Sequence, residues 1–236
     1  MSQFPYRSEP AWVDGRTAET AERERSFLRG VYAWMFGGLA LTALASLVVL
    51  RSPALQQIVF GNPVVMWGLL IAEFVLVMFL QIRIQRLSPA AAASSFAIYS
   101  FMNGLTLSVI FFVYTTQSIA QAFFTAAAMF GAMSVYGMVT KRDLTSWGSF
   151  LVMGAWGIFL CLMVNIFLKS SMLSLIVSVI GVFVFTGLTA YHTQKLKAFA
   201  ASPVHGNLAV YGALMLYLDF INLFLMLLRL FGGRRN

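Results

Sequence analysis

The chain has 236 residues, of which 60% are hydrophobic and only 10% are charged, and its mean hydropathy is +0.82. Soluble domains have an apolar share of about 45–50% and a charged share of about 25%, so this composition excludes an ordinary soluble domain. The formal charge of +8 does not indicate nucleic-acid binding, because the basic residues fall singly or in pairs between apolar runs. We therefore expect a protein embedded in a lipid bilayer, with no nucleic acid among its partners.

The first 29 residues are polar and mixed in charge, and they lack the apolar segment and small-residue cleavage site of a secretory signal. We predict a retained, partly disordered cytoplasmic tail over residues 1–29 and a transmembrane domain over residues 30–236.

Seven apolar runs are long enough to cross about 30 Å of hydrocarbon, which takes roughly 20 helical residues. Turn-like segments separate them, among them Arg51-Ser-Pro53, Gly61-Asn-Pro63 and Ser88-Pro89. The sequence therefore predicts an all-α integral membrane protein, a single bundle of seven transmembrane helices. The expected spans, in chain order, are Gly30–Leu50, Pro63–Ile82, Ala90–Tyr114, Ala120–Val139, Ser149–Leu168, Leu173–Tyr191 and Leu208–Leu230.

Lysines and arginines predict the orientation of the bundle, because they are enriched on the cytoplasmic side of membrane proteins. With the N-terminus in the cytoplasm, most of the 16 basic residues fall in cytoplasmic segments, and the outer side holds Arg51, Lys169, Arg229, Arg234 and Arg235. We expect a cytoplasmic N-terminus and a C-terminus outside. The basic Arg234-Arg235 end prefers the cytoplasm, which leaves a six-span or re-entrant alternative open.

Polar residues inside the second and later spans are candidates for function. Glu73 lies in mid-span, so its carboxyl needs burial or protonation, and we consider it a candidate for a polar cavity. Arg83 and Arg86 are typical of interfacial anchors, with a role in gating the cavity as a second interpretation. Asn103 and Asn165 are typical of contacts between helices.

The last span carries a line of polar groups in an otherwise apolar helix. Asp219, Asn222, Met226 and Arg229 recur at steps of three and four residues, so they share one helix face. An ionised carboxylate inside a bilayer requires a protein partner or a water-filled cavity. We therefore expect this helix at the centre of the bundle, with Asn222 beside the same cavity.

His192, near the end of the sixth span, is the predicted partner of Asp219. The midpoint between them falls at His205-Gly206, inside the only turn-like stretch between the two spans. In an antiparallel pair of helices, both side chains would lie at the same depth, roughly 20 Å from that turn at 1.5 Å per residue. The pair either pins two helices together or forms a titratable gate.

Catalytic chemistry is not expected. Ser134 and His192 superficially suggest an intramembrane serine protease, but Ser134 is not followed by glycine and the sequence shows no oxyanion-hole arrangement. The two histidines, His192 and His205, lack the H-E-x-x-H spacing of zinc hydrolases. We predict a protein that is not an enzyme and has no cofactor.

Three segments together resemble the Bax inhibitor-1 family, most closely its bacterial YbhL-type inner-membrane members. They are MFGAMSVYGMVTKRDLTSWG (Met129 to Gly148), FTGLTAYHTQKLK (Phe185 to Lys197) and GALMLYLDFINLFLMLLRLFG (Gly212 to Gly232). The resemblance covers the chain from Val31 onward. It implies location in a bacterial inner membrane and a seven-helix arrangement in which six helices surround the seventh.

The resemblance also implies a function, a pH-sensitive calcium leak gated by two aspartates on the sixth and seventh helices. Asp219 matches the seventh-helix aspartate and is the candidate calcium ligand, whereas the family pattern A-Y-D-T-Q has aspartate at the position of His192. A His–Asp pair has no repulsion between like charges, and a cationic imidazole opposes a nearby calcium ion. We therefore expect a latch biased towards closure, with calcium or protons as the candidate permeants.

A second interpretation comes from a different class of protein. The chain would then be a membrane regulator or scaffold that binds partner proteins, for instance stress or protease systems, and conducts no ion. Transport by the purified protein in liposomes distinguishes the two interpretations.

The predicted orientation can be tested with reporter fusions. Fusions after Arg86, Lys141 and Lys197 should report the cytoplasm, and fusions after Arg51 and Lys169 should report the outer side, because basic loops stay in the cytoplasm. A cytoplasmic signal from a fusion after Arg235 would contradict the seven-span topology with its C-terminus outside.

Overall fold

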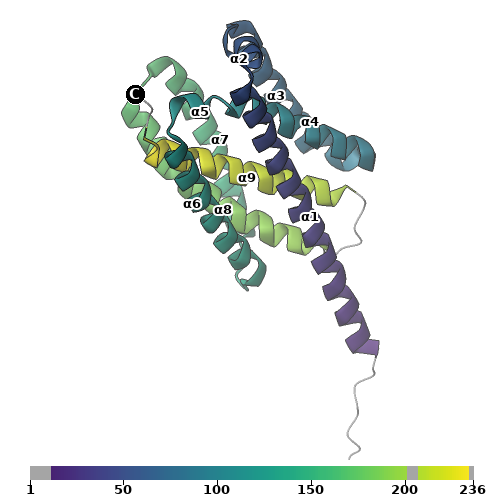
Figure 1. Ribbon diagram of the computed structural model, residues 1–236. Helices are drawn as coiled ribbons and strands as arrows, with labels where there is room; N and C mark the ends of the chain where they lie inside the picture. The colour runs from purple at the N-terminus through teal and green to yellow at the C-terminus, as the bar shows by residue number, and fades with distance from the viewer. Residues whose placement is uncertain (1–11, 201–206, 234–236) are drawn as a thin grey trace, which may run out of the picture.

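The computed structural model describes residues 12–200 and 207–233, with side chains from residue 21 onward. Within these residues the chain is almost entirely helical and contains no strand, and seven helical segments are long and apolar enough to span a membrane (Figure 1). The predicted fold class is confirmed. The spans are formed by α1 (Trp12–Arg51), α3 (Pro63–Arg83) with the 3-10 helix η1 (Ile84–Arg86), α4 (Pro89–Leu107) with α5 (Ile110–Val113), α6 (Thr116–Val139), α7 (Thr145–Leu168), α8 (Ser171–Ala200) and α9 (Leu208–Phe231).

The first helix begins earlier than the first predicted span. α1 starts at Trp12, within the segment assigned to the tail, and its apolar part runs over Ala21–Arg51. In Figure 1 this helix projects well beyond the other helices at its N-terminal end. Residues 1–11, the turn-like segment 201–206 and the basic end at Arg234-Arg235 lie outside the described residues.

The predicted turns are built by a polar residue followed by proline. Ser52 precedes the short helix α2 (Pro53–Phe60), Asn62 precedes α3, and Ser88 precedes α4, and each side chain accepts a hydrogen bond from a backbone N–H in the first turn of its helix. Proline fits the first helical position because its missing N–H has no intrahelical partner there. These signals end one span and start the next, as the sequence predicts.

The last helix, α9, is the most buried of the seven spans. In its most apolar stretch 67% of the residues are buried, whereas the corresponding value for both α3 and α7 is 6%. α9 packs mainly on α8, α1 and α6 and more lightly on α4, while α3 packs on α4 and α7 packs on α8. The expected central position of the seventh span is thus realised as a helix that packs on α8, α1, α6, α4 and η1, with α3 and α7 at the outside of the bundle (Figure 1).

Hydroxyl groups and a glycine bring α1 and α4 close together. Thr42 Oγ1 and Ser46 Oγ of α1 donate hydrogen bonds across the interface to the carbonyl oxygens of Ser100 (2.8 Å) and Gly104 (2.7 Å). A Cβ atom at Gly104 would collide with the backbone of Thr42 and would lie only 2.6 Å from Cβ of Ala45. Small residues allow this close approach, which is typical of helix packing in membranes.

Gly104→Ala should therefore destabilise the protein, by about 1–3 kcal/mol, because the added methyl group has to push α1 and α4 apart. The matched control is Gly131→Ala, since a Cβ atom at Gly131 of α6 would have no neighbour within 4 Å. Thermal unfolding of both variants in the same detergent measures the difference. Equal unfolding temperatures for the two variants would show that the α1–α4 contact does not limit stability.

Candidate functional site

His192 and Asp219 form a direct contact between α8 and α9. Nδ1 of His192 lies 2.6 Å from Oδ2 of Asp219, and only 14% and 4% of the two side chains are exposed. The pairing predicted from the sequence spacing is confirmed, because the two residues do lie at the same depth in neighbouring helices. The intervening residues 201–206 are outside the described part of the chain.

Two glycines let α8 and α9 approach on either side of this pair. A Cβ atom at Gly181 of α8 would lie 2.7 Å from Cγ of Met226, and one at Gly212 of α9 would lie 2.5 Å from Cδ2 of Leu196. Each glycine therefore receives a side chain of the opposite helix. The His192–Asp219 contact lies between these two points along the helices, so its geometry is fixed by apolar packing on both sides.

The imidazole of His192 and the carboxylate of Asp219 attract each other whether the imidazole is neutral or protonated. A neutral imidazole can donate its Nδ1 proton to the carboxylate, and a protonated imidazole adds an ion pair to the same hydrogen bond. Neither state places two like charges next to each other. The contact therefore holds α8 to α9 whether or not the imidazole is protonated.

The other candidate residues do not reach this pair. Arg83 and Arg86 have exposed side chains, and neither takes part in the hydrogen bonds or ion pairs of the described residues. Nδ2 of Asn222 donates to the carbonyl of Leu218 in its own helix, at 2.8 Å. Their placement agrees with an interfacial position for the arginines and a locally satisfied asparagine.

Asn207 holds η1 against the start of α9. Its Nδ2 donates to the carbonyl oxygens of Ile84 and Leu87. This contact ties the segment that contains Arg86 to the N-terminal end of α9, away from the middle of the helix. This role of Asn207 could not be predicted from the sequence, because its acceptors are backbone atoms more than 100 residues away.

Glu73 belongs to a second polar cluster, formed by α3, α4, α9 and α1. Its carboxylate accepts hydrogen bonds from Nδ2 of Asn103 and from Oγ1 of Thr106, the latter at 2.9 Å. The hydroxyl of Tyr217 donates to Oδ1 of Asn103 at 3.0 Å and lies 2.6 Å from Oγ1 of Thr42. Asn103 is thus a contact between helices, as predicted, whereas Asn165 accepts a hydrogen bond from the nearby Ser170 N–H, at the end of its own helix.

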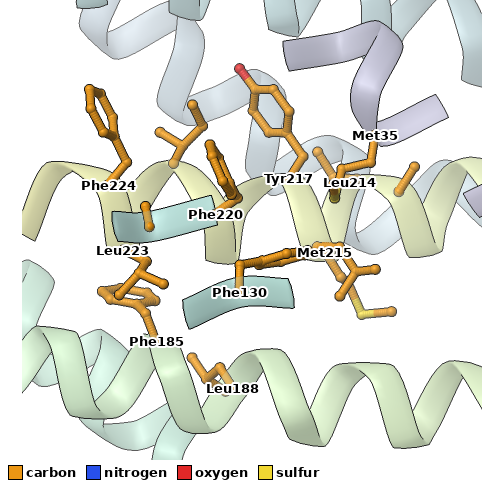
Figure 2. Packing of buried hydrophobic residues seen from close by; sticks show 14 of the residues in the cluster. Met35, Phe130, Phe185, Leu188, Leu214, Met215, Tyr217, Phe220, Leu223 and Phe224 are labelled. Carbon is orange, nitrogen blue, oxygen red and sulfur yellow. The ribbon is translucent and has the colours of Figure 1, made fainter. Parts of the chain in front are cut away.

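Tyr217 separates the two polar groups of the bundle. It is completely buried, and it precedes Asp219 by two residues, which places the two side chains about 200° apart around the helix axis. Figure 2 shows Tyr217 projecting from α9 on the side away from Phe185 and Leu188 of α8, while Met215 points towards them. The structure therefore places Glu73 on the opposite side of α9 from the His192–Asp219 pair, joined to α9 through Tyr217.

Sequence reasoning missed Tyr217, because a tyrosine in an apolar run is read as an aromatic core residue. A signal was present in the neighbouring helices. Thr42 and Ser46 are four residues apart in one span, and Asn103 and Thr106 are three residues apart in another, so each pair forms a polar stripe that needs a partner.

These observations define a polytopic membrane protein whose most buried helix carries a carboxylate paired with histidine on one face and a tyrosine-centred polar cluster on the other. The family model for the inhibitor of apoptosis-promoting Bax1 matches residues 24–236. The chain belongs to the Bax inhibitor-1 family of integral membrane proteins.

Three curated relatives are similar to this chain over most of its length. The chain is 50% identical over 217 residues to the inner membrane protein YbhL of Escherichia coli K12, with 89% of this chain and 93% of the relative covered. It is 41% identical over 220 residues to an uncharacterized protein of Deinococcus radiodurans, covering 92% and 94% of the two chains. It is 37% identical over 211 residues to an uncharacterized membrane protein of Streptococcus pyogenes serotype M1, covering 87% and 92%.

Asp219→Ala should lower the free energy of unfolding by roughly 1–3 kcal/mol, because the buried His192 loses its hydrogen-bond acceptor. Asp219→Asn keeps a hydrogen-bonding group of the same shape and should lose less. Asn222→Ala is the control on the same helix, since Asn222 bonds only to its own backbone. Unfolding in detergent measures all three, and wild-type stability for both Asp219 variants would show that the pair does not hold α8 to α9.

Proposed function

We propose that this protein is an ion leak channel or transporter of the bacterial inner membrane, with its N-terminus in the cytoplasm, and that the His192–Asp219 pair forms its gate. The observation that carries the proposal is the buried 2.6 Å contact between α8 and the most buried helix, α9. Ionisable groups inside a membrane protein are costly to bury and are typical of ion pathways and proton relays. The pair would control the pathway by holding α8 against α9.

The composition of the pair supports a closed resting state. In a dyad of two carboxylates, a single shared proton joins the helices, and loss of that proton leaves two negative charges that repel. His192 removes this repulsion, because its imidazole attracts the Asp219 carboxylate in both of its charge states. We therefore propose a low leak with a weak dependence on pH.

Buried hydroxyl groups on α1, α6 and α8, the three helices that pack most closely on α9, support a route that hydrates on opening. Thr193 follows His192 on α8, and its hydroxyl is buried without a hydrogen-bond partner. Tyr32 and Ser134 also have unpartnered hydroxyls, and both line a cavity of about 280 Å³ between α1, α6 and α9. Unpaired buried hydroxyls are stabilised by water, so movement of α9 relative to α1, α6 and α8 would give entering water several polar groups to contact.

Calcium is the first candidate permeant. Calcium prefers six to eight oxygen ligands, and the described residues contain no group of three or more His, Cys, Asp or Glu side chains that could hold a metal ion. Asp219 would offer a permeating cation one carboxylate, next to an imidazole. Protons are the second candidate permeant, since both groups of the pair can carry them.

We also propose that the protein is not an enzyme. Ser134 and His192, which together suggested a serine protease, are not hydrogen-bonded: the Ser134 hydroxyl has no partner and Nδ1 of His192 faces Asp219. A serine nucleophile is activated by a base within hydrogen-bonding reach.

A non-transporting regulator that binds stress or protease proteins is the second candidate function. The observation that favours it is the same His–Asp attraction, because a pair that stays closed in both charge states supports a bundle with no flux.

His192→Asp tests the gate directly, because it installs the second carboxylate. Calcium flux should be measured with an indicator in proteoliposomes, from about pH 5 to about pH 8. Wild type should leak little and change little with pH. The variant should leak more as pH rises, since loss of the shared proton leaves two repelling carboxylates and an oxygen-rich site for calcium.

Asp219→Asn in both backgrounds is the control, because it removes the carboxylate while keeping its shape. It should abolish the pH dependence of the His192→Asp protein. Superimposable pH profiles for wild type and His192→Asp would show that position 192 does not gate transport. The regulator would then be the better supported function.

A further inference from the structure

A basic pocket lies at one end of the bundle, between α8 and the loop that joins α6 to α7. Its volume is about 430 Å³, within the range of small-molecule sites. Three cationic residues line it, Lys141 and Arg142 from the loop and Lys195 from α8. None of the residues of the His192–Asp219 pair or of the Glu73 cluster lines this pocket, so it is a separate feature of the molecule.

The pocket is held in shape by hydrogen bonds between the loop and α8. Oε1 of Gln194 accepts a hydrogen bond from the backbone N–H of Leu144 at 2.9 Å, and its Nε2 donates to the carbonyl of Arg142 at 2.8 Å. The side chain of Gln194 therefore binds the loop through both of its polar atoms. The loop backbone that carries Lys141 and Arg142 is therefore held beside α8 before any ligand binds, which reduces the entropy lost on binding.

The cations of the pocket lack counter-charges of their own. Among the described residues, the side chains of Lys141 and Arg142 take part in no hydrogen bond or ion pair. The ammonium group of Lys195 lies 5.9 Å and 5.7 Å from the ring centroids of Tyr191 and Phe199. By contrast, Lys197 on the same helix donates to the carbonyl of Met138 and lies 4.0 Å from a carboxylate oxygen of Glu24.

One acidic residue, Asp143, also lines the pocket. Hydrogen bonds from the side chain and the backbone N–H of Thr145 lower the pKa of Asp143, so its carboxylate remains ionised near neutral pH. These bonds direct the carboxylate to Thr145, the first residue of α7. Three cations against one carboxylate leave an excess of two positive charges.

The pocket lies beside the ends of two helices long enough to span a membrane, where lipid headgroups are expected. The loop lies between the end of α6 at Val139 and the start of α7 at Thr145, and Trp147 in the first turn of α7 has 60% of its surface exposed. Tryptophan is enriched where the hydrocarbon meets the headgroups. Tyr191 is fixed as one wall of the pocket, because its ring packs directly on Gly148, where a Cβ atom would collide with it.

We propose that this pocket binds a phosphate group, carried by the headgroup of an anionic phospholipid. Lys141 and Arg142 would contact the phosphate oxygens from the loop, and Lys195 would contact them from α8. Arginine and lysine are the common donors to phosphate, and basic pockets between membrane helices are suited to anionic headgroups. Free inorganic phosphate offers the same chemistry, so the experiment includes it as a separate arm.

The test uses the full-length protein in a neutral detergent. Its unfolding temperature is followed during titration with phosphatidylglycerol, with phosphatidylcholine of the same acyl chains, or with inorganic phosphate against chloride of equal ionic strength. Phosphatidylglycerol should raise the unfolding temperature of wild type more than phosphatidylcholine does. A rise with inorganic phosphate alone would assign the same pocket to the free ion.

Variants then locate the site. Lys141→Gln combined with Arg142→Gln should weaken phosphatidylglycerol binding roughly thirty-fold, and Lys195→Gln alone about five-fold, because each cation contributes about one factor of five to attraction of an anionic headgroup. If the double variant fails to fold, the Lys195→Gln variant carries the test. Native mass spectrometry independently counts the phosphatidylglycerol molecules bound to each variant.

Arg83→Gln combined with Arg86→Gln is the matched control, since it removes two exposed charges at the end of another span. It should keep wild-type binding. Equal weakening in this control would show a general effect of charge and overturn the proposal. Unchanged binding in the Lys141, Arg142 and Lys195 variants, or no effect of either phosphate compound on wild type, would also overturn it.

Discussion

A carboxylate in the most buried helix of a membrane protein has to be satisfied by the protein itself, and this requirement shapes the whole bundle. Hydrocarbon offers no hydrogen bonds, so a buried carboxylate depends on a protein partner. Asp219 of α9 obtains this partner from His192 of α8, and Tyr217, on the other side of α9, obtains partners from α1 and α4. Polar contacts on opposite faces thus fix α9 among its neighbours, and α3 and α7 are left to face outwards.

The two polar groups differ in how easily they can separate. The Tyr217 cluster joins side chains of α1, α3, α4 and α9 through several hydrogen bonds, whereas the pair on the α8 side consists of one contact between two residues. Individual side-chain hydrogen bonds between membrane helices are worth about 0.6 kcal/mol on average. Loss of the single His192–Asp219 contact therefore removes the whole polar link on that side of α9, whereas the cluster keeps other hydrogen bonds when one of them is lost. This asymmetry makes the α8–α9 interface the place where one substitution, such as His192→Asp, can change how two helices are held together.

The sequence predicted the helices and the central pair because both depend on local or regular features. Helix length, proline turns and hydrophobicity define the spans, and the equal distance of His192 and Asp219 from one turn predicts their contact. The partners of Glu73 and Asn207 depend on how helices distant in the sequence pack, and nothing in the chain order specifies that Glu73 meets Asn103 or that Asn207 meets η1. The sequence likewise does not show which glycines are tightly packed. Gly104 is tightly packed, whereas Gly131 has open space beside it.

The end of α8 restricts how the proposed gate can open. Gln194 binds the α6–α7 loop through two hydrogen bonds, and Lys197 contacts the end of α6, so α8 is fixed two to five residues beyond His192. At 1.5 Å per residue this is a lever of roughly 3–8 Å, and a tilt of about 20° about that point moves His192 by only about 1–3 Å. Such a tilt breaks one hydrogen bond but opens no wide passage. A wide opening therefore requires either that α9 moves or that the contacts of Gln194 are released, and these contacts form the wall of the basic pocket.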